Sequence, residues 1–153
     1  MSAAGLRAHV VSVSDTVHID APRSAVFEYL DDPHNHVEVT PSLVDVENVE
    51  PLDIGGNGAE FAYSIAGVEL DGTLVETTHH PDGRMVFELR GQLPGEIEIT
   101  FADADGGTRV TYAAEYEIPG TVLSRVAEPF VRRYNERELR TLLENLRTRL
   151  EDT

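Results

Sequence analysis

The sequence predicts an α+β fold in which an antiparallel sheet is covered on one face by a long C-terminal helix. Residues 120–150 carry apolar side chains at spacings of three and four, the pattern of a helix with one buried face. Upstream, short segments alternate between apolar and polar residues and are separated by turn sequences, which is typical of antiparallel strands. One face of these segments is apolar and the other polar, so the sheet is covered on one side only. The expected order is one strand, two short helices, six strands and the long helix, which gives about seven strands.

The first third of the chain predicts one strand and the two short helices. Val10 to Asp20 has valine or isoleucine at most of its odd-numbered positions and is expected to be a strand. Ala21-Pro22 breaks this strand and opens a helix, because proline is tolerated in the first helical turn. Asp31-Asp32-Pro33 ends the helix, since the residue before a proline avoids helical angles, and Pro33 to Val39 is a second short helix. Residues 1–9 precede the strand and are expected to form a loose N-terminus.

Six alternating segments follow between residues 43 and 118. Turn sequences such as Ala66-Gly67 and His80-Pro81-Asp82-Gly83 separate them. The segment that starts at Leu43 has apolar residues on both faces, so the pattern does not define which face is buried. The alternation continues in phase across Gly72, and we interpret this glycine as a bend or bulge within one long strand.

The C-terminal helix is expected to run from Gly120 to Leu150, about 45 Å at 1.5 Å per residue. Pro129 lies inside it and cannot donate a hydrogen bond to the carbonyl of Arg125, so we expect a kink or a fresh start there. Asn135 and Glu138 interrupt the apolar stripe near its middle.

The composition indicates a soluble chain without cysteine chemistry. Its 153 residues fit a single domain, residues 1–153, with a core of its own. The absence of cysteine excludes disulfides, thiol catalysis and thiolate metal sites. No run approaches the ~18 apolar residues of a membrane span, and the first residues lack the apolar run of a secretion signal. We therefore expect a cytoplasmic protein with no stable membrane insertion.

The charge is strongly acidic. There are 28 acidic and 12 basic residues, all of the latter arginine, and the net charge is −16. This balance argues against nucleic acid as a partner, because binding phosphates needs a clustered basic face. The acids are dispersed rather than gathered in a tail, which resembles proteins adapted to high intracellular salt. The alternative is an acidic protein from a high-GC source that is not halophilic.

Four short segments, mostly turns and core positions, carry a resemblance to a known superfamily. They are Val17-His18-Ile19-Asp20-Ala21-Pro22 with the following Val26-Phe27-Glu28-Tyr29-Leu30, then Pro81-Asp82-Gly83-Arg84, Gly106-Gly107-Thr108-Arg109-Val110-Thr111 and Tyr116-Glu117-Ile118-Pro119-Gly120. Together with the element order, they make the chain similar to the START-like (SRPBCC) superfamily, and within it to the polyketide cyclase/dehydrase-type, lipid-transport-like group. The resemblance covers about Val10 to Leu150. It implies a helix-grip fold, with a curved sheet wrapped on the C-terminal helix and a cavity between them for an apolar or aromatic small molecule.

Bulky residues on the apolar faces are the candidate lining of this cavity. Tyrosine rings suit such a space and their hydroxyls can orient a ligand, although the alternative is a core tyrosine bonded to backbone or water. Glu76 is in phase with inward-facing leucines, so its carboxylate would point inward at the end of the strand. The alternative is that Glu76 lies at the sheet rim in water. The candidates are Phe61, Tyr63, Leu70, Leu74, Glu76, Met85, Phe87, Leu89, Ile99, Tyr112 and Tyr116 on strands, and Phe130, Tyr134 and Glu138 on the helix.

Three of these residues are also candidates for acid/base chemistry. Glu138, Tyr134 and Tyr112 would serve a cyclase-like or dehydratase-like step if burial raised the pKa of the carboxyl group. The alternative is that Glu138 forms an ion pair with Arg109, Arg133 or another surface arginine.

Histidines do not predict a metal site. His34 and His36 are two residues apart on an expected helix, so their side chains point to opposite sides, and the sequence offers no evident third ligand. His79-His80 is interpreted as polarity at a strand end and turn. We therefore expect neither a metal ion nor a cofactor.

Three hypotheses for function follow. The first is a binding module that holds a small hydrophobic molecule, such as a lipid, a quinone or a polyketide-like compound. The second is a cyclase- or dehydratase-type enzyme that uses the same cavity. The third is a protein-interaction module with a vestigial cavity.

The halophile hypothesis predicts that salt stabilises the protein. Screening of the dispersed acidic residues should raise the free energy of unfolding between low salt and molar KCl, measured by urea denaturation at each salt concentration. A free energy of unfolding that does not change with KCl would contradict the hypothesis.

Overall fold

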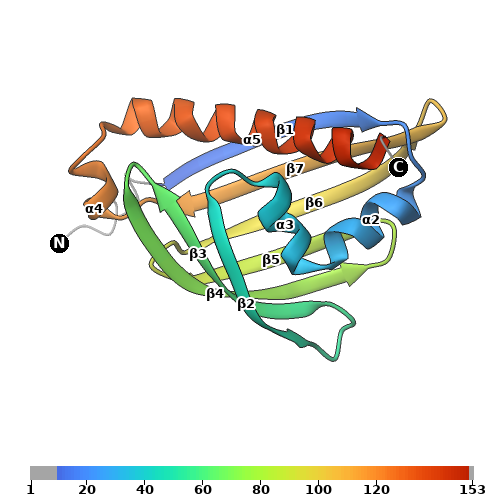
Figure 1. The fold of residues 1–153 in the computed structure, drawn as a ribbon, viewed down its shortest axis with the longest axis horizontal. Helices are drawn as coiled ribbons and strands as arrows, with labels where there is room; N and C mark the ends of the chain where they lie inside the picture. The colour runs from blue at the N-terminus through green and yellow to red at the C-terminus, as the bar shows by residue number, and fades with distance from the viewer. Residues whose placement is uncertain (1–9, 152–153) are drawn as a thin grey trace.

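The computed structural model describes residues 10–151 and shows the predicted helix-grip fold (Figure 1). A seven-stranded antiparallel sheet curves around one long helix, with strand order β1-β7-β6-β5-β4-β3-β2. The expected loose N-terminus, residues 1–9, lies outside the described residues. The elements are β1 (Val10–Ile19), α2 (Arg23–Asp31), α3 (Pro33–Val39), β2 (Leu43–Pro51), β3 (Asn57–Ile65), β4 (Val68–His80), β5 (Arg84–Gly91), β6 (Gly95–Ala104), β7 (Gly107–Glu117), α4 (Gly120–Leu123) and α5 (Glu128–Glu151).

The connections explain the shape of the sheet. Strands β2 to β7 form a continuous antiparallel meander, and β1 pairs with β7 at its far edge. Helices α2 and α3 therefore carry the chain from one edge of the sheet to the other. Helix α5 lies across the concave face and contacts β1, while α3 packs against both β2 and α5. Fully buried side chains such as Met85, Ile99 and Leu143 fill the layer between sheet and helix.

The long helix is shorter than predicted and has a separate beginning. The expected helix from Gly120 to Leu150 is two helices, because α4 ends at Leu123 and α5 begins at Glu128. Pro129 is the second residue of α5, where its missing N–H costs least, so the fresh start is confirmed and the continuous helix was wrong. The 24 residues of α5 span about 36 Å rather than 45 Å.

Two irregular strands depart from simple alternation. In β2 the buried residues Leu43 and Val46 are three apart, because the register shifts between Leu43 and Asp45, and a second shift follows between Glu47 and Glu50. This explains why the pattern there did not define a buried face. In β4 the strand runs through Gly72 without a shift, and the bulge lies instead between Glu76 and Thr78. The glycine is still required, since a Cβ there would lie 2.1 Å from the carbonyl oxygen of Arg90.

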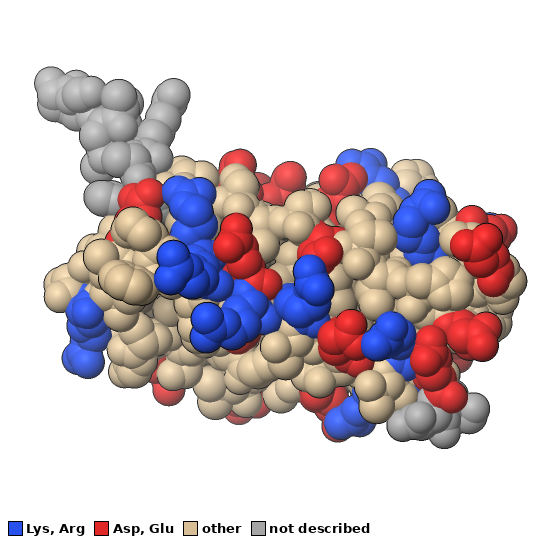
Figure 2. Space-filling view, turned by 90° about the horizontal axis from the view of Figure 1, so that it is seen from above, with Lys and Arg blue, Asp and Glu red and all other residues tan. Residues whose placement is uncertain are grey.

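Charge is distributed unevenly over the surface. Half of the 12 basic residues lie on α5, and Figure 2 shows them along the face that this helix presents. Arg140 pairs with Asp15 of β1 at 2.9 Å, and Arg149 pairs with Glu38 of α3. These exposed pairs connect α5 to its neighbours, although each contributes little stability on its own. No helix within residues 10–151 combines the length and the apolar composition that crossing a bilayer requires.

Candidate functional site

Two small cavities lie side by side between the sheet and the helices. The first, of about 40 Å³, lies under α5, and the second, of about 30 Å³, lies towards α3 and β2. Tyr63, Tyr112 and Thr40 line both, so these three side chains form the partition between them. Each cavity has room for two or three water molecules, whereas pockets for drug-sized ligands occupy about 300–1,000 Å³.

Eight of the fourteen proposed lining residues border these cavities, namely Phe61, Tyr63, Leu74, Phe87, Leu89, Tyr112, Tyr116 and Glu138. Leu70, Met85 and Ile99 are instead buried in the surrounding core. Glu76 is 3% exposed and points inward, but it belongs to a polar cluster with His79 at the end of β4 rather than to either cavity wall.

Phe130 and Tyr134 lie near the helix surface, contrary to the expected placement. The Phe130 side chain is 60% exposed and lies against the guanidinium of Arg133, with the guanidinium carbon 5.9 Å from the ring centroid. The restart of α5 resets the helical phase, so its buried stripe begins at Val131 and continues through Asn135. Tyr134 is 39% exposed, although its ring reaches back to the loop that precedes β2.

The tyrosines supply neutral hydroxyls to the first cavity. Burial raises the pKa of Tyr63, Tyr112 and Tyr116 far above the ordinary value, and the nearby carboxylate of Glu138 raises each further. The hydroxyls of Tyr63 and Tyr116 hydrogen-bond to each other. All three rings therefore remain protonated at neutral pH and can donate hydrogen bonds into an apolar space.

Glu138 hydrogen-bonds to the loop between α3 and β2 rather than to an arginine. Its Oε2 accepts a hydrogen bond from the backbone N–H of Ser42 at 2.7 Å, and it also interacts with the Tyr134 hydroxyl. The Tyr134 hydroxyl in turn hydrogen-bonds the Ser42 hydroxyl. The expected ion pair with Arg109 or Arg133 is not among the contacts of the described residues. Glu138 thus fixes the connection between α3 and β2 over the first cavity.

Among the described residues that line the first cavity, Asn135 is the one with a fully buried polar side-chain atom that has no hydrogen-bond partner. The residue is 9% exposed and lines that cavity, yet its Nδ2 is buried without a hydrogen-bond partner. A buried donor of this kind costs about 1–3 kcal/mol when nothing accepts from it. A ligand group or an ordered water in the cavity would accept from this donor, and either explains a polar residue in the middle of the buried stripe.

Several wall residues were missed by sequence reasoning. Thr40 and Ser42 are buried, but they lie in the loop after α3, where no periodic pattern assigns a facing direction. His36 was considered with His34 only as a metal ligand. The two point apart as expected: His34 bonds Asp32, whereas His36 is buried beside the second cavity with its Nε2 2.7 Å from the Leu30 carbonyl oxygen. Burial lowers the pKa of His36, so the ring is neutral and donates to that carbonyl.

Comparison with protein families gives a match over the whole of the described chain. Residues 10–151 match the family described as "Polyketide cyclase / dehydrase and lipid transport". The chain belongs to this family. No curated protein matches the chain in sequence.

Solved structures of START-like proteins and aromatase/cyclases share the fold of this family member. A START superfamily protein from Mycobacterium smegmatis superposes with a TM-score of 0.76 at 15% identity, covering 92% of this chain and 97% of that chain. The Zhui aromatase/cyclase from Streptomyces sp. R1128 gives 0.73 at 17% identity, covering 94% of each chain. The di-domain ARO/CYC StfQ of the steffimycin biosynthetic pathway gives 0.75 at 13% identity, covering 97% of this chain and 53% of that chain. At these identities the similarity establishes the fold alone.

The unsatisfied amide of Asn135 predicts that its removal stabilises the protein. Asn135→Leu removes a buried donor without a partner and should raise the free energy of unfolding by about 1 kcal/mol in urea denaturation. Asn145→Leu is the matched control on the same helix, because Asn145 Nδ2 donates to the Val39 carbonyl at 3.0 Å. The control should lower the free energy of unfolding by about 1 kcal/mol. If Asn135→Leu destabilised the protein as much as the control does, Asn135 would be an ordinary structural residue.

Proposed function

We propose that this protein binds an apolar or aromatic small molecule that carries a hydrogen-bonding group, in the space between the sheet and α5. The observation that carries the proposal is the first cavity, which combines apolar walls with an unpartnered amide donor at Asn135. Ligand pockets generally have this composition, mostly apolar with a few polar groups that fix orientation.

The polar groups of the first cavity come from both the helix and the sheet. Asn135 offers a donor from α5, Glu138 offers acceptor oxygens one turn later, and Tyr112 and Tyr116 present neutral phenols from β7. A carbonyl or hydroxyl group of a ligand would find both donors and acceptors within this region. The second cavity has a more apolar wall, with Phe61, Phe87 and several aliphatic side chains, and suits a hydrocarbon or ring.

Binding requires the two cavities to merge. Neither cavity alone holds more than a few water-sized groups, and the partition between them consists mainly of the rings of Tyr63 and Tyr112. Rotation of these two side chains would join the first cavity, with its polar groups, to the more apolar second cavity without moving the strands. Loss of the hydrogen bond between Tyr63 and Tyr116 would be offset by hydrogen bonds from the freed hydroxyls to the ligand.

An enzyme of cyclase or dehydratase type is the second candidate. The observation that favours it is the position of the Glu138 carboxylate next to the buried tyrosines, whose pKa values it raises. A carboxylate can remove a proton from a bound carbonyl compound while neutral phenols stabilise the oxyanion that develops. Tyr134 is less suited to this role because its hydroxyl is engaged by Ser42.

Filling the first cavity should weaken binding. Ala114 lines this cavity on β7, whereas its neighbour Ala113 faces the opposite side of the sheet. Ala114→Leu should weaken the binding of an uncharged fluorescent probe, N-phenyl-1-naphthylamine, at least about tenfold, since the lost volume excludes the ring. Ala113→Leu should leave the affinity unchanged. Thermal unfolding verifies that each variant is folded, and Ala114→Val provides a milder change at the same position.

Two other outcomes would count against the proposal. Equal probe affinity in both leucine variants would place the probe outside the cavity. No saturable probe binding, together with no co-purified small molecule in native mass spectra, would favour the protein-interaction hypothesis. If a co-purified compound is found, Glu138→Gln separates carrier from enzyme, because glutamine can still accept from the N–H of Ser42 but cannot act as a base. If the protein is a carrier, Glu138→Gln should keep the affinity for the compound, and neither the wild-type protein nor the variant should convert it. If the protein is an enzyme, the wild-type protein should convert the compound and Glu138→Gln should not.

A further inference from the structure

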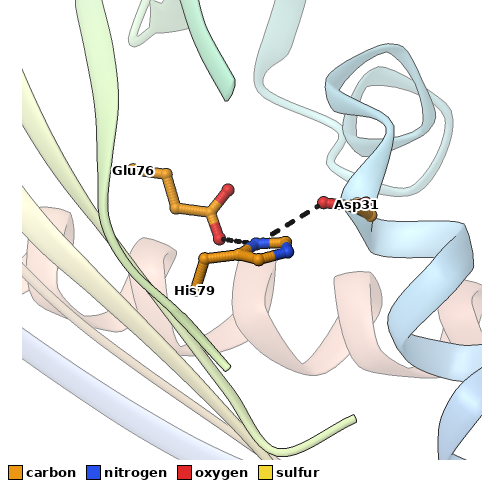
Figure 3. Close-up of side chains that lie close together, drawn as sticks. All are labelled: Asp31, Glu76 and His79. Atoms are coloured by element: carbon orange, nitrogen blue, oxygen red, sulfur yellow. Dashed lines mark hydrogen bonds and ion pairs between the residues drawn. The ribbon is translucent and has the colours of Figure 1, made fainter. Parts of the chain in front are cut away.

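A second polar cluster lies at the end of β4, apart from both cavities. Asp31, the last residue of α2, approaches Glu76 and His79 of β4 (Figure 3). His79 Nδ1 lies 2.7 Å from Glu76 Oε2 and 3.8 Å from Asp31 Oδ1. One nitrogen and two carboxylate oxygens, one from each residue, lie within 4.8 Å of one another.

The bulge in β4 creates this cluster. Residues three apart on a regular strand point to opposite faces, so Glu76 and His79 would diverge. Because the register shifts between Glu76 and Thr78, the two side chains point to the same inward face, where Glu76 pairs across from Phe87 and His79 from Met85. Bulges commonly direct a side chain into a site in this way.

The cluster is largely buried, and one of its carboxylate oxygens has no hydrogen-bond partner. The side chains of Glu76 and His79 are 1% and 9% exposed, and that of Asp31 is 37% exposed. Asp31 Oδ1 is nevertheless shielded from solvent and accepts no hydrogen bond. A cation between the three groups would supply the missing partner for Asp31 Oδ1.

The surrounding loop supports the three side chains. The backbone N–H of Asn57 donates to Glu76 Oε1 at 3.2 Å, and its Nδ2 donates to the Asp31 carbonyl at 3.0 Å. Gly56 passes so close that a Cβ there would lie 2.1 Å from Glu76 Oε1. Outer hydrogen bonds of this kind orient the ligands of metal sites. The ring of Phe27 packs edge-on against that of His79, with centroids 5.2 Å apart.

We propose that Asp31, Glu76 and His79 bind one divalent transition-metal ion through an imidazole nitrogen and two carboxylate oxygens. Zn²⁺ fits this mixed set better than Mg²⁺ or Ca²⁺, which prefer oxygen ligands alone. Tetrahedral ligands at 2.0–2.2 Å from Zn²⁺ are roughly 3.4 Å apart, a value that lies between the two distances observed from His79. Three protein ligands would leave a fourth position for a solvent molecule.

Zn²⁺ binding to the full-length chain tests the proposal. After treatment with a chelator and without a histidine tag, the protein should take up one Zn²⁺ per chain, measured by isothermal titration calorimetry and by competition with a chelating dye. Asp31→Asn, Glu76→Gln and His79→Ala should each weaken the affinity about tenfold or more. His80→Ala and His34→Ala are the matched controls and should leave it unchanged, since His80 is exposed at the strand end and His34 pairs with Asp32 on the surface.

A purely structural role for the cluster gives different results. In that case Zn²⁺ would not raise the melting temperature of the wild-type protein, or would raise that of Asp31→Asn equally. Asp31→Asn is decisive if the buried substitutions prevent folding, because Asp31 is partly exposed and its oxygen has no hydrogen bond to lose. Saturable Zn²⁺ binding that survives all three substitutions would place the ion among the dispersed surface acids and overturn the proposal. Absence of saturable binding would overturn it as well.

Discussion

The structure depends on how the space between a curved seven-stranded sheet and a single covering helix is filled. One helix is narrower than the concave face that it covers, so side chains from the sheet must reach across the remaining gap. Aromatic residues such as Phe61, Tyr63, Phe87 and Tyr112 do this, and the two cavities lie on either side of Tyr63 and Tyr112. Filling the gap with tyrosine rather than leucine brings hydroxyls into the core, where each needs a partner. The interior is therefore apolar in volume but contains several hydrogen-bonding groups.

Several polar residues on α5 hydrogen-bond to neighbouring segments, whereas one buried polar residue does not. Glu138 and Tyr134 bind the loop at Ser42 and so connect the C-terminal helix to the segment that carries the chain across the sheet. Asn145 has a comparable role through the Val39 carbonyl. Asn135 alone among these residues keeps a buried donor without an acceptor. Local violations of this kind are expected at functional positions.

Much of the fold could be predicted from the sequence because alternation and helical spacing record which face of each element is buried. The order of the elements along the chain and the covering helix follow from these patterns, and so do buried positions such as Met85 and Ile99. The placement of Phe130 failed because the periodicity of residues 120–150 does not reveal where a helix restarts, although Pro129 indicated a break.

The candidate sites were harder to predict, since they arise from irregular features. Ser42 lies in a loop, where no period assigns a direction, and the association of Glu76 with His79 depends on a bulge that changes which side chains share a face. The sequence marked Asn135 as a break in the apolar stripe, but its missing hydrogen-bond partner becomes visible only once the surrounding side chains are placed.

The central claim is that a ligand occupies the region where the rings of Tyr63 and Tyr112 now separate two cavities. A crystal structure of the protein with bound N-phenyl-1-naphthylamine tests it most directly. The account predicts one continuous cavity that contains the probe, with both tyrosine rings rotated and the strands in place. A probe bound on the outer surface, with both rings in their present positions, would contradict it.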